Sequence, residues 1–212
     1  MKRILKQITP RTWSVERWSP GYVRARIAQS WFRLRHPDYP WLTKESIGIL
    51  DKWIRPDHSV VEFGSGGSTL YFAARCGRLV SYEHDGNWHR KVSSRLNKPG
   101  YDHVELHCFA LEDPKYCNHV SCLADQSIDL VLIDGRRRAE CTWNALPKLK
   151  PGGLLVIDNA ERYLARDGGV FAGKQSTHFS EDTWRMVAGH TASWKRQWTD
   201  NGVWTTLILH CP

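Results

Sequence analysis

The chain has 212 residues, 41% of them hydrophobic, and its 30 basic and 22 acidic residues give a formal net charge of +8. This size and apolar content fit one domain of ordinary size with a substantial core. No apolar run approaches the ~18 residues of a membrane-spanning helix, and the start MKRILKQITPRTW lacks the apolar centre of a secretion signal. These features argue against an integral membrane or secreted protein and predict a cytoplasmic one.

The basic excess lies in residues 1–36, the N-terminal arm, which holds nine of the basic residues and one acidic residue, Glu16. In a helix predicted there, Ile27, Trp31 and Leu34 share one face. The arginines lie elsewhere around that helix: Arg24, Arg26, Arg33 and Arg35. Three interpretations stay open: a lid helix that docks on the core by this apolar face and leaves its arginines in water, a helix lying on an anionic membrane, and a segment that binds nucleic acid or an acidic partner.

Beyond the arm, residues 37–212 form the predicted main domain, in which helices and strands alternate. After a turn, Thr43 and Ser46 open a helix that leads into the first strand. Strands are predicted at 59–63, 79–83, 104–109, 128–133 and 154–157, and helices from about 68, over about 86–96 and over about 139–146. This α/β alternation predicts a doubly wound, parallel sheet with helices on both faces.

Two β-rich runs, 192–199 and 203–210, close the chain on either side of the sequence Asp-Asn-Gly. Asn-Gly between such runs is the strongest short signal for a β-hairpin. We therefore expect the parallel sheet to finish in an antiparallel hairpin, which is not the usual arrangement of a dinucleotide dehydrogenase.

The first strand runs directly into a glycine-rich turn, in the sequence SVVEFGSGGST. Such glycines let backbone N–H groups approach a nucleotide-like ligand closely. The nicotinamide fingerprint Gly-x-Gly-x-x-Gly has its third glycine where this chain has Thr69, which favours instead a turn in which Ser68 and Thr69 cap the next helix. About twenty residues later Glu83 closes the second strand, where a doubly wound fold places the acid that binds ribose hydroxyls.

Several motifs in this order resemble the class I S-adenosylmethionine-dependent methyltransferases: EFGSGGST at 62–69, YEHD at 82–85, LVLIDG at 130–135, LKPGGLLVIDN at 149–159 and the closing hairpin. The resemblance runs from near Ser46 to the C-terminus. It implies a Rossmann-like sheet of seven strands with an antiparallel last strand. It also implies that S-adenosylmethionine lies across the C-terminal edges of the first strands.

The same resemblance implies these cofactor-binding residues: Glu62, Gly64, Ser65, Gly66, Ser68, Thr69, Glu83 and His84. Glu62 is expected to orient the turn and the amino-acid end of the cofactor. The methionine part is expected to lie on Gly64, Ser65 and Gly66. Glu83 is expected to bind the ribose diol, and His84 to lie against the adenine.

Two other strand ends carry oxygen ligands, Asp134 in IDGRRR and Asp158 with Asn159 in VIDNAER. Carboxylate and amide oxygens that converge at one sheet edge suit Mg²⁺ or Ca²⁺. This pattern resembles the metal-dependent O-methyltransferases of the catechol and caffeoyl-CoA type, in which such residues hold a divalent ion that positions the acceptor hydroxyl and lowers its pKa. The resemblance makes Asp134, Asp158 and Asn159 candidate metal ligands; without a metal, Asp134 would still contact acceptor or cofactor.

That family has a lysine base three residues past the first Asp, where this chain has Arg137. Arginine stays protonated, so either the metal alone activates the acceptor or another base does. We take Asp134, Arg137 and Asp158 as the candidate catalytic residues. Other candidate bases, which we do not rank, are His119, His178 and Glu161.

Guanidinium groups are expected around the acceptor mouth, from Arg136, Arg137, Arg138 and Arg162. Their fork geometry fits carboxylate or phosphate, which favours an anionic acceptor such as a sugar phosphate, a uronic acid or a glycolipid head group. Arg138 is the exception, because we expect it to begin a helix and point into water. The long segment 160–180 has the composition of an active-site loop.

The sequence therefore predicts a methyltransferase acting on a hydroxyl of a small or carbohydrate-like anionic acceptor, with a divalent metal as a second expected cofactor. One alternative is a nucleic-acid methyltransferase that uses the basic arm for backbone contacts, which the neutral charge of the rest of the chain disfavours. The other is a cofactor-binding or membrane-docked scaffold without catalysis, for which the missing lysine is the only positive hint.

Overall fold

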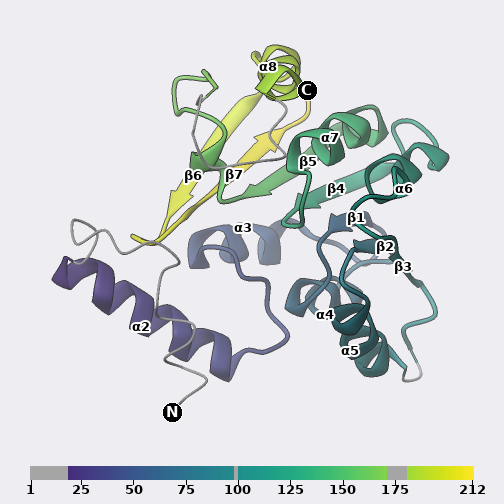
Figure 1. The fold of residues 1–212 in the computed structure, drawn as a ribbon, viewed down its shortest axis with the longest axis horizontal. Helices are drawn as coiled ribbons and strands as arrows, with labels where there is room; N and C mark the ends of the chain where they lie inside the picture. The colour runs from purple at the N-terminus through teal and green to yellow at the C-terminus, as the bar shows by residue number, and fades with distance from the viewer. Residues whose placement is uncertain (1–18, 98–99, 171–180) are drawn as a thin grey trace.

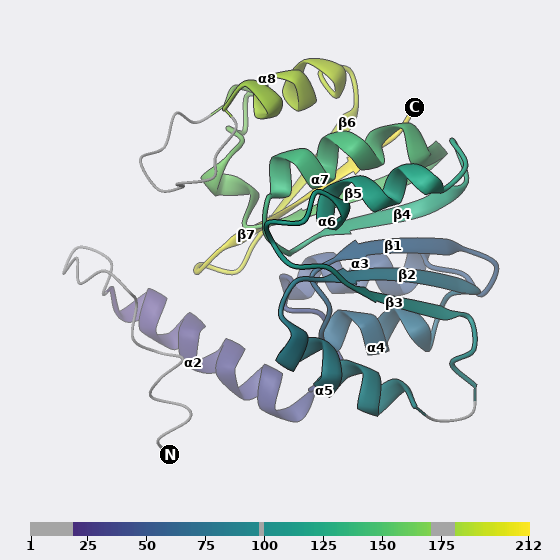
Figure 2. The ribbon, with the colours of Figure 1, turned by 45° about the vertical axis from the view of Figure 1, so that its right-hand side comes forward.

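The computed structural model describes residues 19–97, 100–170 and 181–212, and its centre is a seven-stranded sheet (Figures 1 and 2). The strands follow the order β3-β2-β1-β4-β5-β7-β6. Their bounds are β1 (Ser59–Phe63), β2 (Arg78–Glu83), β3 (Val104–Cys108), β4 (Ile128–Ile133), β5 (Leu149–Asp158), β6 (Lys195–Asp200) and β7 (Thr205–His210). Strand β7 runs antiparallel to β5 and β6, and the other neighbouring pairs are parallel, as the sequence predicts.

Helices cover both faces of this sheet (Figure 1). One face carries α3 (Lys44–Trp53), α4 (Gly67–Ala73) and α5 (Gly86–Leu96), and the other carries α6 (Lys115–Asn118), α7 (Arg138–Ala145) and α8 (Glu181–His190). The short 3-10 helices are η2 (His119–Cys122), η3 (Leu146–Lys148) and η4 (Ala160–Arg162). The chain therefore has the three-layer, doubly wound architecture that the alternating pattern indicates.

The core has two layers because neighbouring side chains of a strand point to opposite faces. In β1, Val61 and Phe63 belong to the layer below α6, α7 and α8, and Val60 belongs to the layer below α3 and α4. Glu62 alternates with them onto the Val60 face, and none of it is exposed. The first strand thus carries a carboxyl group into the core, directly before the glycine turn.

The hairpin strands begin later than predicted, β6 at Lys195 and β7 at Thr205. The side-chain oxygen of Asn201 accepts the N–H groups of Val203 at 3.0 Å and Trp204 at 3.1 Å, so both residues belong to the turn. Helices α6 and α8 were not predicted. Helix α8 did carry a sequence signal, since Glu181 and Asp182 lie in its first turn.

The N-terminal helix α2 (Pro20–Arg35) lies against the turn of this hairpin. Ser19 caps it by accepting the N–H of Tyr22 at 3.2 Å. On its inner face the buried Gln29 donates to the carbonyl of Leu42 at 3.5 Å and accepts from Asn201 at 3.4 Å. The helix is therefore docked on the domain, but not as the lid interpretation expects. The predicted apolar face of Ile27, Trp31 and Leu34 is exposed, and Arg33 is turned inward against two indole rings. The division of the chain at residue 36 stays a prediction, because residues 1–18 lie outside the described ranges.

None of the helices in the described ranges is long and apolar enough to cross a membrane.

Candidate active site

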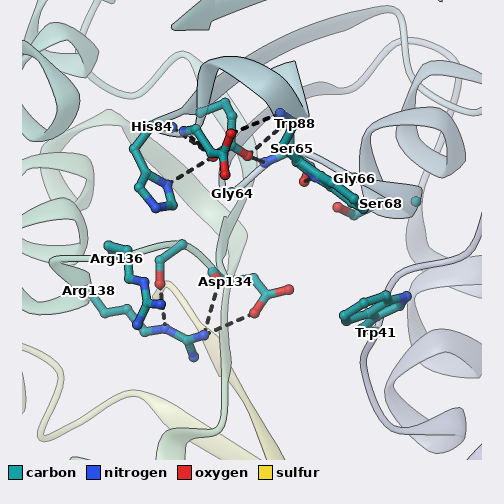
Figure 3. A pocket seen from close by; sticks show the side chains of 14 residues that line it. Trp41, Gly64, Ser65, Gly66, Ser68, His84, Trp88, Asp134, Arg136 and Arg138 are labelled. Carbon is teal, nitrogen blue, oxygen red and sulfur yellow. Dashed lines mark hydrogen bonds and ion pairs between the residues drawn. The ribbon is translucent and has the colours of Figure 1, made fainter. Parts of the chain in front are cut away.

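A cavity of about 440 Å³ opens at the C-terminal ends of β1, β2 and β4 (Figure 3). Its lining residues come from the glycine turn, the β2–α5 junction, the end of β4 and the segment before α3: Trp41, Gly64, Ser65, Gly66, Gly67, Ser68, Glu83, His84, Asp85, Trp88, Asp134, Gly135, Arg136 and Arg138. This is the crevice in which doubly wound sheets bind ligands, and its volume lies within the roughly 300–1,000 Å³ of small-molecule sites. Most of the predicted cofactor-binding residues line it, and so does Asp134.

Two facing glycines, Gly64 after β1 and Gly135 after β4, allow the ends of these two strands to approach closely. Gly64 has φ +99°, and a Cβ there would lie 2.8 Å from the backbone nitrogen of Gly135. Beside this contact the N–H of Asp134 donates to the carbonyl of Phe63 at 2.9 Å. The glycine turn and Asp134 therefore share one cavity because β1 and β4 are neighbours in the sheet.

Glu83 holds the glycine turn and the end of β2 together. Its Oε2 accepts both the backbone N–H and the hydroxyl of Ser65, each at 2.9 Å. Its Oε1 accepts the N–H groups of His84 at 2.7 Å and Asp85 at 2.9 Å, and it pairs with His84 Nδ1 at 2.9 Å. The side chain expected to bind ribose hydroxyls thus also organises the wall around them.

Glu62 and Thr69 lie behind the cavity wall rather than in it, which corrects two of the predicted contacts. The Thr69 hydroxyl donates to Glu62 and accepts the N–H of Gly66 at 2.8 Å, and the Ser81 hydroxyl donates to Glu62 at 2.7 Å. Glu62 therefore orients the turn from below, without reaching the cofactor's expected place. The helix begins at Gly67 after its N-cap Gly66, so Ser68 lies inside the helix and does not cap it. Thr69, at the third helical position, does cap it, because its hydroxyl accepts the N–H of the N-cap residue.

Trp88 completes this wall, and the sequence analysis missed it. Asp85 caps α5 by accepting the N–H groups of Asn87 at 2.8 Å and Trp88 at 3.0 Å. The indole N–H of Trp88 then donates to the carbonyl of Ser65 at 2.6 Å. The sequence signal that could have found it is Asp85, because a capping aspartate marks the start of the helix and so places Trp88 in its first turn.

On the opposite wall, Asp134 faces the cavity with 26% of its side chain exposed (Figure 3). The Nη2 of Arg138 donates to Oδ1 and to the backbone oxygen of Asp134, both at 3.0 Å. The other guanidinium nitrogens donate to the carbonyl groups of Gly135, at 3.0 Å, and of Asp158. The positive charge of Arg138 is thereby fixed beside the carboxylate at the end of β4.

Asp158 lies deeper, 5% exposed, where it accepts from the Thr206 hydroxyl at 3.4 Å and shares a hydrogen bond with Asp134. Burial, and then the charge of Asp134, raises the pKa of Asp158 well above its ordinary 3.8. Burial also raises the pKa of Asp134, but Arg138 opposes that effect. We therefore assign the shared proton to Asp158, which leaves Asp134 ionised and paired with Arg138.

The expectation that Arg138 points into water is wrong, since only 11% of its side chain is exposed. The chain passes through the left-handed region at Arg137, φ +46°, just before α7 begins. The Arg137 side chain then contacts Glu140 at 3.8 Å and the carbonyl of Leu111 at 3.5 Å, away from the cavity lining. Arg136 is exposed and lines the cavity, and its guanidinium has no hydrogen bond or ion pair within the described ranges.

The expected metal ligands do not form a metal site. Asp134 lines the cavity, whereas Asp158 and Asn159 do not, and burial raises the pKa of Asp158. The guanidinium of Arg138 already binds the Asp134 carboxylate, where a cation would have to reach it. Among the described residues, no group of three or more His, Cys, Asp or Glu is arranged to hold a metal ion. These residues therefore do not fit a bound divalent cation.

The other candidate bases and the last arginine lie away from the cavity lining. Glu161 accepts the N–H and the hydroxyl of Thr205 at 3.1 and 2.7 Å, so it anchors the start of β7. His119 contacts the Tyr82 hydroxyl at 3.5 Å. Arg162 is exposed next to Glu161. His178 and residues 171–180 of the predicted loop lie outside the described ranges.

Trp41 forms the third side of the cavity, and an arginine of α2 holds it there (Figure 3). The guanidinium of Arg33 lies 4.0 Å from the ring centroid of Trp41 and 4.7 Å from that of Trp204. Burial and the like charge of Arg26 lower the pKa of Arg33 to about 10, while Asp158 and Asp134 oppose this. Arg33 therefore keeps its charge at neutral pH near the acidic strand ends. The basic composition of the arm did not predict that this arginine would lie against the cavity wall.

A family model described as a methyltransferase domain matches residues 61–160. The match includes the glycine turn, Glu83 and both acidic strand ends, and the seven-stranded order is that of the class I fold. The chain is an S-adenosylmethionine-dependent methyltransferase with the class I fold. No curated protein sequence matches this methyltransferase.

Solved structures similar to the methyltransferase share its fold at low identity. An O-methyltransferase from Bacillus cereus, in complex with S-adenosylhomocysteine (SAH), is 15% identical with a TM-score of 0.60, covering 100% of this chain and 96% of its own. A putative caffeoyl-CoA O-methyltransferase from Staphylococcus aureus is 12% identical with a TM-score of 0.58, covering 89% and 92%. An rRNA methylase from Streptococcus thermophilus is 14% identical with a TM-score of 0.51, covering 78% and 93%.

Proposed function

We propose that the methyltransferase transfers the methyl group of S-adenosylmethionine to a hydroxyl oxygen of a small or carbohydrate-like anionic acceptor, without a metal ion. The observation that carries this proposal is the partly exposed carboxyl group of Asp134, paired with Arg138, in the same cavity as the glycine turn. Similarity to a structure solved with SAH and to O-methyltransferases supports the reaction class.

The methyl donor, S-adenosylmethionine, would bind along the wall formed by the glycine turn and Glu83. The methionine part would lie along Gly64, Ser65 and Gly66, and the ribose hydroxyls at Glu83. Because the carboxylate of Glu83 already accepts the Ser65 hydroxyl, a ribose hydroxyl would replace or share that bond. Bound S-adenosylmethionine supplies an activated methyl group, so the protein mainly has to align the acceptor oxygen with it and exclude water.

On the acceptor side, Asp134 would take the proton of the hydroxyl as its oxygen bonds to the methyl carbon. The charge of Arg138 favours the ionised form of this carboxyl group, and its Nη2 orients the residue through hydrogen bonds to Oδ1 and to the backbone oxygen. Asp158, which holds the shared proton, would stabilise the charge of Asp134 from behind. In the proposed reaction, Arg138 would take the part that a divalent ion has in the metal-dependent O-methyltransferases, which the sequence resembles. No step of the proposed reaction requires that ion.

An anionic acceptor is supported by the unpaired guanidinium of Arg136 on the cavity wall. A planar guanidinium binds carboxylate or phosphate through two parallel hydrogen bonds. The charge of Arg33 behind Trp41 adds to the positive potential on the same side. Together they would hold an acidic group of the acceptor while its hydroxyl faces Asp134.

Methyl transfer from labelled S-adenosylmethionine to a panel of hydroxyl compounds, with and without carboxylate or phosphate groups, tests this proposal. Asp134→Asn should lower the rate by about 10²–10⁴-fold, the usual contribution of a general base, while calorimetry shows SAH affinity nearly unchanged. Arg136→Ala should raise KM for anionic acceptors more than for neutral analogues. Arg185→Ala, at an exposed arginine on α8, is the matched control and should change neither value.

Chelator treatment should leave transfer intact; loss of activity that Mg²⁺ restores would contradict the metal-free arrangement. Undiminished transfer by Asp134→Asn would remove that residue as the base. Salt-sensitive transfer to RNA or DNA alone would favour a nucleic-acid methyltransferase. SAH binding with no transfer to any acceptor class would favour a scaffold.

A further inference from the structure

The outer face of α2 carries large apolar side chains in contact with solvent. Ile27 is 44% exposed, and Trp31 and Leu34 are each 58% exposed. Their spacing of four and three residues places them in one stripe along the helix. We call these three residues the α2 stripe. Few other large apolar side chains of the described residues are as exposed.

The α2 stripe is not needed to hold the helix on the domain. The inner face does that, through the buried Gln29 and through Arg33 between Trp41 and Trp204. Exposed apolar side chains gathered on one face of a docked helix indicate a surface that another body covers.

Positive charge flanks the stripe. Arg24 and Arg35 are exposed, and successive angles of 100° per residue place both on the Trp31 side of the helix. The guanidinium of Arg35 lies 5.8 Å from the centroid of the Trp31 ring. The helix contains no acidic residue. Its outer face therefore combines an apolar centre, an indole and a cationic edge on the Trp31 side.

We propose that the α2 stripe docks on the surface of an anionic phospholipid bilayer. A tryptophan is favoured at the depth of the head groups, and arginines beside it reach the phosphates while their stems stay on apolar surface. An isoleucine and a leucine on the same face enter the acyl boundary. Nucleic acid fits this face less well, because phosphate contacts need cations at the centre of the surface rather than three large apolar side chains.

Docking would bring the active-site cavity near the bilayer, because Arg33 on the inner face of α2 contacts Trp41 on the cavity wall. The docking proposal does not rest on the proposed reaction. A protein that binds vesicles and transfers no methyl group to a hydroxyl would leave it standing.

The test is co-sedimentation of the full chain with vesicles of phosphatidylglycerol and phosphatidylcholine, compared with vesicles of phosphatidylcholine alone. Binding is expected to the anionic vesicles and to weaken with salt. The double variant Trp31→Ser/Leu34→Ser should bind at least about tenfold more weakly, since burying one such side chain contributes more than one tenfold step in affinity. Met186→Ser, at a 49% exposed methionine on α8, is the matched control and should bind like wild type.

Equal SAH affinity of all variants in calorimetry would show that they are folded. The proposal is overturned if wild type ignores anionic vesicles, or if Trp31→Ser/Leu34→Ser binds them as wild type does. It is also overturned if wild type ignores vesicles but sediments as a dimer that the double variant dissociates, because a second copy then covers the stripe. RNA binding that the apolar variant retains and Arg24→Gln/Arg35→Gln loses, with no vesicle binding, overturns it in favour of nucleic acid.

Discussion

Glu62 is a carboxyl group without exposed surface, bonded to the hydroxyls of Thr69 and Ser81. Burial raises its pKa from 4.5 to about 7, although those hydroxyls oppose the shift. The folded protein therefore holds this proton more tightly than the unfolded chain. The stabilisation is complete below about pH 4.5 and is lost as the pH rises through about 7.

Glu62→Gln should remove this pH dependence while keeping an oxygen for both hydroxyls. Between about pH 4.5 and 8 the free energy of unfolding of wild type should fall relative to the variant by roughly 3 kcal/mol, the equivalent of the pKa shift. Urea unfolding across this range measures the difference. Glu105→Gln, which removes an exposed partner of Arg78, should leave the profile unchanged. Parallel profiles for wild type and Glu62→Gln would show that Glu62 does not titrate as stated.

Residue types at strand ends were predictable, but their orientation was not. Glu83 and Asp134 end parallel strands, so the sequence suffices to place them at one edge. Which of three consecutive arginines turns inward depends on the left-handed backbone of Arg137, and no sequence rule requires that conformation of an arginine. The exchange of roles between Arg137 and Arg138 follows from this single residue.

At the scale of elements, the glycine turn brings the backbone after β1 into contact with the backbone after β4. Gly67 makes a second close approach, since a Cβ there would lie 2.8 Å from the carbonyl oxygen of Pro37. The backbone that leads to Trp41 can therefore pass directly over the start of α4. The cavity has three walls because glycines admit the neighbouring backbone at both places.

Gly64→Ala should destabilise the fold by more than about 2 kcal/mol, because a Cβ at φ +99° is strained and meets the backbone of Gly135. Urea unfolding measures this, and SAH affinity should fall with it. Gly48→Ala is the matched control, since an added Cβ on that exposed position of α3 meets nothing within 4 Å. It should stabilise by about 0.5–1 kcal/mol. Equal stability of Gly64→Ala and wild type would contradict the close contact of the two turns.

Element types were more predictable than their ends. Periodicity and glycine signals sufficed for β1, β4 and α5, whose bounds match the expected ranges. The hairpin was also expected, but its turn is longer because Asn201 bonds two following N–H groups through its side chain. Short α6 has only four residues, too few for any periodic pattern to show.

Across the whole molecule, α2 and the last hairpin are joined through a cation, beside the hydrogen bond between Gln29 and Asn201. Arg33 contacts Trp41 before α3 and Trp204 in the β6–β7 turn. Sequence alone does not pair residues so far apart, and amphipathicity indicated as the packed face the stripe of Ile27, Trp31 and Leu34, which is exposed in the structure. The Arg33 contact is therefore the part of the site that sequence analysis had no means to find.

A double-mutant cycle of Arg33→Met and Trp204→Leu should give a coupling free energy of about 1 kcal/mol in urea unfolding, as expected for a partly buried cation–π contact. Arg185→Met with Trp204→Leu is the control cycle, because Arg185 pairs with Glu181 and Asp182 instead. That cycle should show no coupling. Additive effects of Arg33→Met and Trp204→Leu would mean that the two side chains do not stabilise one another.

The sandwich of Arg33 between two indoles also bears on the order in which a newly made chain matures. Translation runs from the N-terminus, so α2 leaves the ribosome long before Trp204 and Asn201, which Arg33 and Gln29 contact. Until the final hairpin is released, the nascent helix has only its contacts with Trp41 and Leu42. The mouth of the cavity is thus among the last regions to mature, and premature termination before residue 204 would remove β7 together with the contacts that α2 makes with the hairpin.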